Sequence, residues 1–239
     1  MRSQAHKTTA LVRVSLYVYL AFAIAQFGCG GGQTPAIRSG FPVGATCPAA
    51  GNSGQEFFPA EFLGAPLELG LKTSERMATY LRAADQRPLW CSAAPEEAYR
   101  ILWIASNRPA RTADLTKTSE GWLGTGVEFS DPRKIPLAAA PPSTIERRFV
   151  SKPSLTDIDA FLKAIETAKL WTIPSWRYST EAFDGAILSM EMRAEGRYRI
   201  IIRGKISDPS FEETVRMLLQ AAGVPVLEET KGSGVQTGS

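Results

Sequence analysis

Two carboxylates, Asp184 and Glu191, have the residue type and spacing that acid–base chemistry needs in this chain of 239 residues. If their side chains converged at a suitable separation, they would form an acid and base pair of the kind that cleaves glycosides. A structural interpretation competes with this one. Asp184 with Gly185 would form a turn that enters a strand, and Glu191 would pair with Arg199 across two strands, worth under about 1 kcal/mol if exposed. We favour the structural interpretation, and whether the protein is an enzyme stays open at this point.

Histidine is missing from most of the chain. The only one is His6, which lies in a segment that we expect to be removed. Without an imidazole the mature chain cannot form Ser-His-Asp or Cys-His machinery or a His-ligated metal site. The sequence also lacks a Walker phosphate loop, a dinucleotide fingerprint, an EF-hand loop and a Gly-x-Ser-x-Gly elbow. We therefore expect no cofactor and no metal, and prefer a non-catalytic binding module over a small carboxylate-dependent hydrolase.

Two of the five tryptophans indicate a binding surface. Trp171 and Trp176 bracket a Pro-containing loop next to the stretch that carries the two carboxylates, and exposed aromatic side chains there would contact a ligand or a protein. The predicted surface consists of Trp171, Trp176, Asp184, Glu191 and Arg199. Packing in the core is the alternative for both tryptophans.

The first 28 residues have the pattern of an export signal. Arg2, Lys7 and Arg13 precede an apolar run at 14–25, and Ala23-Ile24-Ala25 supplies small residues at cleavage spacing. An uncleaved membrane span is the alternative, but the run is shorter than the roughly 20 residues that cross a bilayer. We expect the chain to be exported and the signal to be removed.

Gly28-Cys29-Gly30 follows the apolar run, and here the chain resembles a bacterial lipoprotein. In that family a cysteine preceded by a small residue is lipidated and becomes the mature N-terminus. The resemblance implies that Cys29 carries a lipid that holds the protein at a membrane of the cell envelope. Export, a flexible tether, a neutral mature chain and the missing catalytic groups together favour a module that binds another envelope protein or a ligand there. Secretion after Ala25, which would give a soluble periplasmic or secreted protein, is the alternative.

The charge balance argues against nucleic acid as a partner. The whole chain has a formal net charge of +3, but three basic residues and no acidic ones lie in the signal, which leaves 24 basic and 24 acidic residues. A neutral chain lacks the basic footprint of nucleic-acid binding or of a polybasic membrane contact. The local cluster of Arg197, Arg199, Arg203 and Lys205 is then expected to be a solvated sheet face.

Cys47 and Cys91 are the cysteines that remain if Cys29 is lipidated, an even number in an oxidising compartment. A disulfide between them would close a loop of roughly forty residues and stabilise the fold by about 2 to 4 kcal/mol. The alternative is a buried free thiol at Cys91 and an unpaired Cys47 in a linker.

Composition divides the rest of the chain into three parts. Residues 29–56 are rich in Gly, Ala, Pro and Ser, which is typical of a flexible tether. Large apolar residues return at Phe57, and they predict a single globular domain over 57–227. Residues 228–239 are polar and Gly-rich, and we expect a disordered tail there.

The stretch from Asp184 to Lys205 predicts a two-stranded hairpin with its turn around Glu195 and Gly196. Residue types alternate on both sides of this turn with the period of half-buried strands. Separating an apolar face from a charged face requires a three-residue loop at 194–196, with Gly196 in the left-handed conformation. That register sets Met192 opposite Tyr198, Met190 opposite Ile200, Leu188 opposite Ile202 and Glu191 opposite Arg199.

Helices and further strands are predicted around this hairpin. Amphipathic helices are expected at residues 73–84, after a capping box at 154–157, and after Asp208. Strands are expected at 99–104, 112–116, 122–129 and 145–151. Together these elements indicate an α+β domain with a single antiparallel sheet and about three helices packed mainly on one face.

The domain also resembles an uncharacterised family of bacterial proteins. The pattern is a helix ending in Pro-Leu, a Tyr-Arg strand, a helix ending in Trp and Pro, and then Asp-Gly with an acidic residue six places on and a returning tyrosine. In this chain these features are Pro88-Leu89, Tyr99-Arg100, Trp171 with Pro174, Asp184-Gly185, Glu191, Tyr198 and Arg203. The resemblance covers roughly residues 77–222, and implies a shared fold without an established activity.

Overall fold

A computed structural model describes residues 41–42, 46–47, 57–58, 67–104, 108–130, 144–177, 187–203 and 208–226. For residues 41–42, 67–72 and 176–177 it describes the backbone alone. All of these residues belong to one compact unit, Ser39–Ser239. The predicted export signal, Cys29, Asp184 and the C-terminal tail lie outside the described residues.

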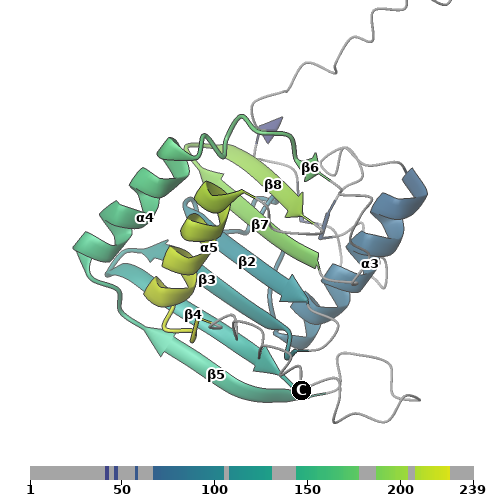
Figure 1. Ribbon diagram of the computed structural model, residues 1–239, viewed down its shortest axis with the longest axis horizontal. Coiled ribbons are helices and arrows are strands. Elements are labelled where there is room, and N and C mark those ends of the chain that lie inside the picture. The colour runs from purple at the N-terminus through teal and green to yellow at the C-terminus, as the bar shows by residue number, and fades with distance from the viewer. Residues whose placement is uncertain are drawn as a thin grey trace, which may run out of the picture. The chain divides into compact units, whose positions relative to one another are not determined.

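The described residues form one sheet and three helices (Figure 1). The helices are α3 (Leu67–Ala83), α4 (Leu155–Thr167) and α5 (Pro209–Ala221). The six long strands are β2 (Ala98–Ile104), β3 (Arg111–Thr118), β4 (Gly121–Phe129), β5 (Ile145–Ser151), β7 (Ile187–Ala194) and β8 (Arg197–Arg203). They are all antiparallel and follow the order β8-β7-β2-β3-β4-β5, so the predicted α+β fold is confirmed.

Two short strands lie at the β8 edge of the sheet. β1 (Phe41–Pro42) pairs with β8 in the antiparallel sense, and β6 (Trp176–Arg177) pairs with β8 in the parallel sense. The predicted disulfide is confirmed, since Cys47 and Cys91 are bonded with their Cα atoms 4.8 Å apart. Four residues of the predicted tether, 41–42 and 46–47, are therefore attached to the domain.

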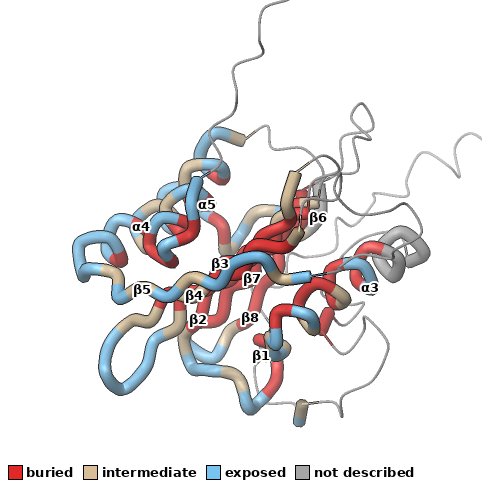
Figure 2. The backbone as a smooth tube through the Cα atoms, turned by 90° about the horizontal axis from the view of Figure 1, so that it is seen from below, coloured by how far each residue is buried: buried red, intermediate tan, exposed pale blue. Residues whose placement is uncertain are grey.

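Helices cover both faces of the sheet, and most of the strand residues between them are buried (Figure 2). On one face, α4 and α5 pack over apolar residues of β2, β3 and β7 such as Ile101, Leu115 and Met190. On the other face, α3 packs over Leu102 of β2 and Ile200 of β8. None of the helices in the described part of the chain is long and apolar enough to cross a membrane.

Local sequence signals placed the starts of two helices correctly. Ser154 caps α4 through a capping box, in which its side chain accepts from the Asp157 amide and the Asp157 side chain accepts from the Ser154 amide. Asp208 caps α5, and Pro209 occupies the first position of that helix. The third helix, α3, begins at Leu67, six residues before the predicted start.

The predicted register of the hairpin is wrong. The loop has two residues, Glu195 and Gly196, both with positive φ, of 52° and 68°. This is the geometry of a tight turn whose twist matches the flanking strands. It sets Met192 opposite Arg199 and Glu191 opposite Ile200. The prediction required one apolar and one charged face, but because helices cover both sheet faces, both sides of the hairpin are buried and that requirement does not hold.

The expected solvated face is wrong for two of its four residues, while the Arg197 side chain is 39% exposed and Lys205 lies outside the described residues. Arg199 and Arg203 are both buried and bind backbone carbonyl groups of the connection that follows α4. Arg199 donates to the carbonyl of Ile173, and Arg203 donates to that of Pro174 at 3.1 Å. These arginines fasten that connection along β8.

Candidate functional site

Glu191 lies in a buried network of charged and polar side chains on the α3 face of the sheet. Arg100 on β2 stands directly opposite Asp114 on β3 and Glu191 on β7. Its Nε atom donates to Asp114 Oδ1 at 2.6 Å, and its Nη1 atom donates to Glu191 Oε2 at 3.2 Å. The hydroxyl of Tyr198 on β8 donates to the other carboxylate oxygen, Glu191 Oε1, at 2.9 Å. The network therefore spans four neighbouring strands.

Arg100 also joins the sheet to the connection between α3 and β2. Its Nη1 atom donates to the Arg87 carbonyl oxygen at 3.0 Å, and its Nη2 atom donates to Gln86 Oε1 at 2.9 Å. All three of its nitrogen atoms thus donate within the domain. Relative exposure is 3% for Arg100, 5% for Asp114, 2% for Glu191 and 1% for Tyr198, so the connection seals the network from solvent.

Two carboxylates share the guanidinium of Arg100 in this network, and burial has the largest effect on the pKa of each carboxylate. Desolvation raises the pKa of Asp114 and of Glu191, and the charge of Arg100 opposes the rise in both. Burial and the neighbouring Glu191 raise the pKa of Tyr198 well above its usual value. Asp114 Oδ2 is buried with no hydrogen-bond partner among the described residues. If both carboxylates were ionised, the network would bury one excess negative charge, which is costly in a low-dielectric interior.

Glu191 is not part of the binding surface that was predicted from the sequence. Both of its oxygen atoms are occupied by protein donors, and its partners are Arg100 and Tyr198 in place of the predicted Arg199. General acid–base catalysis needs a carboxylate within hydrogen-bond reach of the substrate, whereas in this arrangement both oxygen atoms of Glu191 contact protein donors and the residue is almost fully buried. Its predicted catalytic partner, Asp184, lies outside the described residues.

The other members of the predicted binding surface have different positions. Arg199 is buried under the connection after α4, so it does not form part of a surface. Trp171 is half-buried and packs against the core under α4 and α5, with the Arg197 guanidinium 4.7 Å from its ring centre. The side chain of Trp176 lies outside the described atoms.

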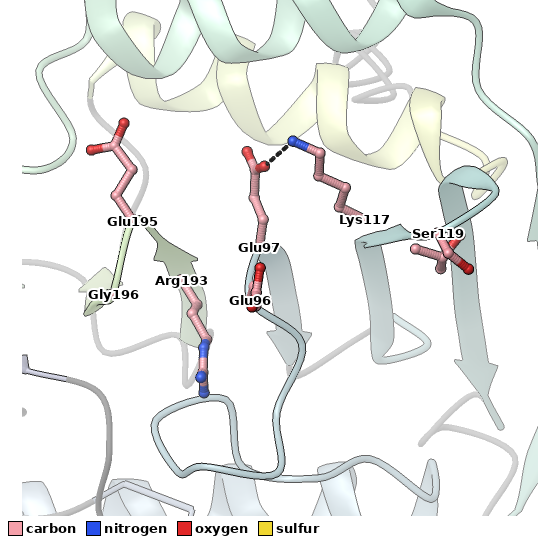
Figure 3. Close-up of a pocket in the computed structure, with 8 residues that line it drawn as sticks. Glu96, Glu97, Lys117, Ser119, Arg193, Glu195 and Gly196 are labelled. Atoms are coloured by element: carbon pink, nitrogen blue, oxygen red, sulfur yellow. Dashed lines mark hydrogen bonds and ion pairs between the residues drawn. The ribbon is translucent and has the colours of Figure 1, made fainter.

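A cleft of about 640 Å³ lies at the end of the sheet where β2 begins and the β3–β4 and β7–β8 turns meet (Figure 3). Most of the residues that line it are charged, although polar and apolar atoms contribute equally to its surface. The residues that line it are Glu96, Glu97, Lys117, Thr118, Ser119, Arg193, Glu195 and Gly196. Sequence reasoning did not single out any of them as a site, because they come from three separate segments of the chain.

The cleft has an acidic side and a buried basic residue. Glu97, Lys117 and Glu195 extend toward α4 and α5, whereas Arg193 extends toward the α3 side (Figure 3). Lys117 forms an ion pair with Glu97 at 2.9 Å, and this contact raises the pKa of Lys117. Glu97 also accepts from the Tyr99 hydroxyl at 3.1 Å. These contacts hold Glu97 in one position and leave Glu195 and Glu96 as the most exposed carboxylates of the rim.

Arg193 is buried in the cleft wall and binds the backbone around the disulfide. Its Nη1 atom donates to the carbonyl oxygens of Leu89 and Cys91. Burial lowers its pKa, and the nearby Glu96 opposes this change. No described acidic residue forms an ion pair with Arg193. Its contacts show that it positions the segment that carries the disulfide.

The described part of the chain contains no group of three or more His, Cys, Asp or Glu side chains arranged to hold a metal ion. No family model matches the chain, and no curated protein is similar to it.

Arg100 and Asp114 were not predicted as site residues. A signal for Arg100 was present, since it is a single charge inside an otherwise apolar strand, and such a charge is buried only with partners.

Proposed function

We propose that the protein is an exported, lipid-anchored, non-catalytic module that binds another protein of the cell envelope. The export pattern at residues 1–28 and the cysteine at position 29 support the location. The neutral mature chain supports a protein partner over nucleic acid. The cleft at the end of the sheet is the contact surface in this proposal.

The observation that carries the proposal is the burial of Glu191. This residue is the acid or base that a carboxylate-dependent hydrolase would need, and it is 2% exposed with both oxygen atoms bonded to Arg100 and Tyr198. Its role is to stabilise the sheet. A binding module does not need an accessible acid or base, and it contacts its partner through exposed side chains.

Exposed charges at the cleft rim favour it as the contact surface. The side chain of Glu195 is 79% exposed and that of Lys117 is 57% exposed, although each has a partner within the domain. Charged rim residues of this kind steer a partner and fix its orientation. Changing them should alter binding without disturbing the core.

Capture from envelope extract tests the proposal. Purified processed protein is compared with a Glu96→Lys/Glu195→Lys variant and with a matched control, Glu213→Lys, which reverses a half-exposed carboxylate on α5 outside the cleft. We expect the wild type and the control to capture the same partner and the cleft variant to lose it. Equal capture by all three proteins contradicts the use of the cleft. Substrate turnover that Glu191→Gln abolishes contradicts the non-catalytic role.

A further inference from the structure

β5 forms one edge of the sheet in the described part of the chain (Figure 1). β4 pairs with one side of β5, and no described strand pairs with the other side. The amide and carbonyl groups along such an edge are a template for pairing with another strand. The opposite edge differs, because β1 and β6 both pair with β8 there. β5 is therefore the edge to which a further strand can be added.

Exposed apolar side chains gather at this edge. Val150 on β5 is 75% exposed, and Leu155, four residues after the end of β5, is 74% exposed. They are two of the three large apolar residues that are exposed in the described part of the chain. Phe149, next to Val150, is half-buried against the core under α4 and α5. Apolar side chains left in contact with water favour association with another surface.

Charge limits how two copies of β5 can pair. In an antiparallel pair of identical strands, one residue lies opposite itself on the two-fold axis, and its neighbours pair on either side. An axis at Arg147 or at Arg148 sets two arginines opposite one another. An axis at Val150 sets Arg148 opposite Lys152. Like charges in direct opposition destabilise a pair of strands, so these three registers are unfavourable.

An axis at Phe149 avoids these repulsions. The two copies of Phe149 then meet on the axis, on the same face of the joined sheet. Val150 lies opposite Arg148, whose aliphatic stem can cover it. Arg147 lies opposite Ser151. No two residues of like charge are opposed in this register.

Opposite charges complete the same register. Just beyond the central pairs, Glu146 lies opposite Lys152 of the second copy, and symmetry forms this pair twice. Both residues are exposed, and in the described part of the chain neither forms an ion pair within its own domain. Glu146 is also the extra residue of a bulge between β4 and β5, so the ladder with β4 leaves it unpaired. The strand is thus complementary in charge to a second copy of itself.

We infer that two copies of this protein pair through β5, with the two-fold axis at Phe149, and join their six long strands into one continuous sheet. The interface is isologous, since each copy presents the same strand to the other. No residue that lines the cleft lies on β5, so pairing and binding at the cleft use different residues. The inference depends neither on the proposed lipid anchor nor on the proposed partner.

Sedimentation equilibrium over a concentration series tests the pairing. The processed chain carries Cys29→Ser, which prevents lipidation, and keeps its disulfide. We expect a reversible monomer–dimer equilibrium. Glu146→Lys should weaken the dimer by about tenfold or more, because it sets two lysines opposite one another twice. Glu146→Lys/Lys152→Glu exchanges the charges and should restore it. The matched control Glu166→Lys, an exposed reversal on α4, should leave it unchanged.

Cysteine cross-linking tests the register. In the same background, Phe149→Cys, Arg148→Cys and Arg147→Cys each place a thiol on the axis of one register. Directly opposed residues have Cβ atoms about 4.5 to 5.5 Å apart, close to the separation that a disulfide bridges. We expect mild oxidation to give a cross-linked dimer with Phe149→Cys alone. Preferential cross-linking of either arginine position overturns the register. The charge exchange tests the same register without altering the half-buried Phe149.

The remaining outcomes also decide the inference. A protein that stays monomeric at every concentration up to about 1 mM overturns it. A dimer that Glu146→Lys leaves unchanged, or that the exchanged charges do not restore, uses another surface and overturns it as well. If the β5 amides of a monomeric protein are protected from hydrogen exchange along the free edge, a segment of the same chain is the occupant, and the second copy is excluded.

Discussion

Replacing Arg100 with leucine should destabilise the domain strongly. The change removes four hydrogen bonds, to Asp114, Glu191, Gln86 and the Arg87 carbonyl. It also leaves two buried carboxylates without a counter-charge. Removing one partner of a buried ion pair typically costs about 3 to 5 kcal/mol. Because Arg100 has two acidic partners, we expect a loss of about 4 kcal/mol, a large part of the 5 to 15 kcal/mol typical of a domain.

Urea unfolding at pH 7, followed by circular dichroism, measures this loss on the chain with its disulfide intact. Arg216→Leu is the matched control, since Arg216 forms an ion pair with Glu213 on the exposed surface of α5. An exposed pair of this kind contributes under about 1 kcal/mol. A loss below about 1 kcal/mol for Arg100→Leu, equal to the control, would refute the structural role that we give to the network.

The same network predicts two further results, and the disulfide predicts a third. Burial raises the pKa of Glu191 above its usual value of 4.5, so the contribution of this residue to stability is present at low pH and is lost as the pH rises through the folded-state value. The urea midpoint of the wild type relative to that of Glu191→Gln should therefore fall as the pH is raised from 4.5, and an increase would contradict the sign. Tyr198→Phe removes a donor to Glu191 and should cost about 1.5 to 3 kcal/mol in the same assay, whereas no change would mean that the bond contributes nothing. Cys47→Ser/Cys91→Ser removes a disulfide between cysteines 44 positions apart and should lower the free energy of unfolding by about 2 to 4 kcal/mol. An unchanged thermal midpoint would contradict this.

The sequence was sufficient for elements that local signals define. The starts of α4 and α5 follow from Ser154, Asp208 and Pro209, because N-terminal caps act on amides within three residues of themselves. The turn at Glu195 and Gly196 was located because its signal is also local. The length of its loop was predicted wrongly, because the register depends on which sheet faces are buried, and helices far along the chain decide that.

The contacts of single candidate site residues could not be predicted from local sequence. Glu191 was expected opposite Arg199, but the two-residue turn shifts the pairing by one position and turns Glu191 to the α3 face. There it meets Arg100, which lies 91 positions away in the sequence. The cleft shows the same difficulty, since Glu97 and Glu195 become neighbours through strand pairing alone.

The central claim is that this domain binds through its exposed cleft and uses its buried carboxylate for stability. The most direct test is the affinity of purified wild type, Glu191→Gln and Glu96→Lys/Glu195→Lys for the partner captured from envelope extract, each confirmed to be folded. The account predicts equal affinity for wild type and Glu191→Gln and at least a tenfold loss for the cleft variant, a difference of about 1.4 kcal/mol. Loss of function in folded Glu191→Gln with the cleft variant unaffected would contradict it.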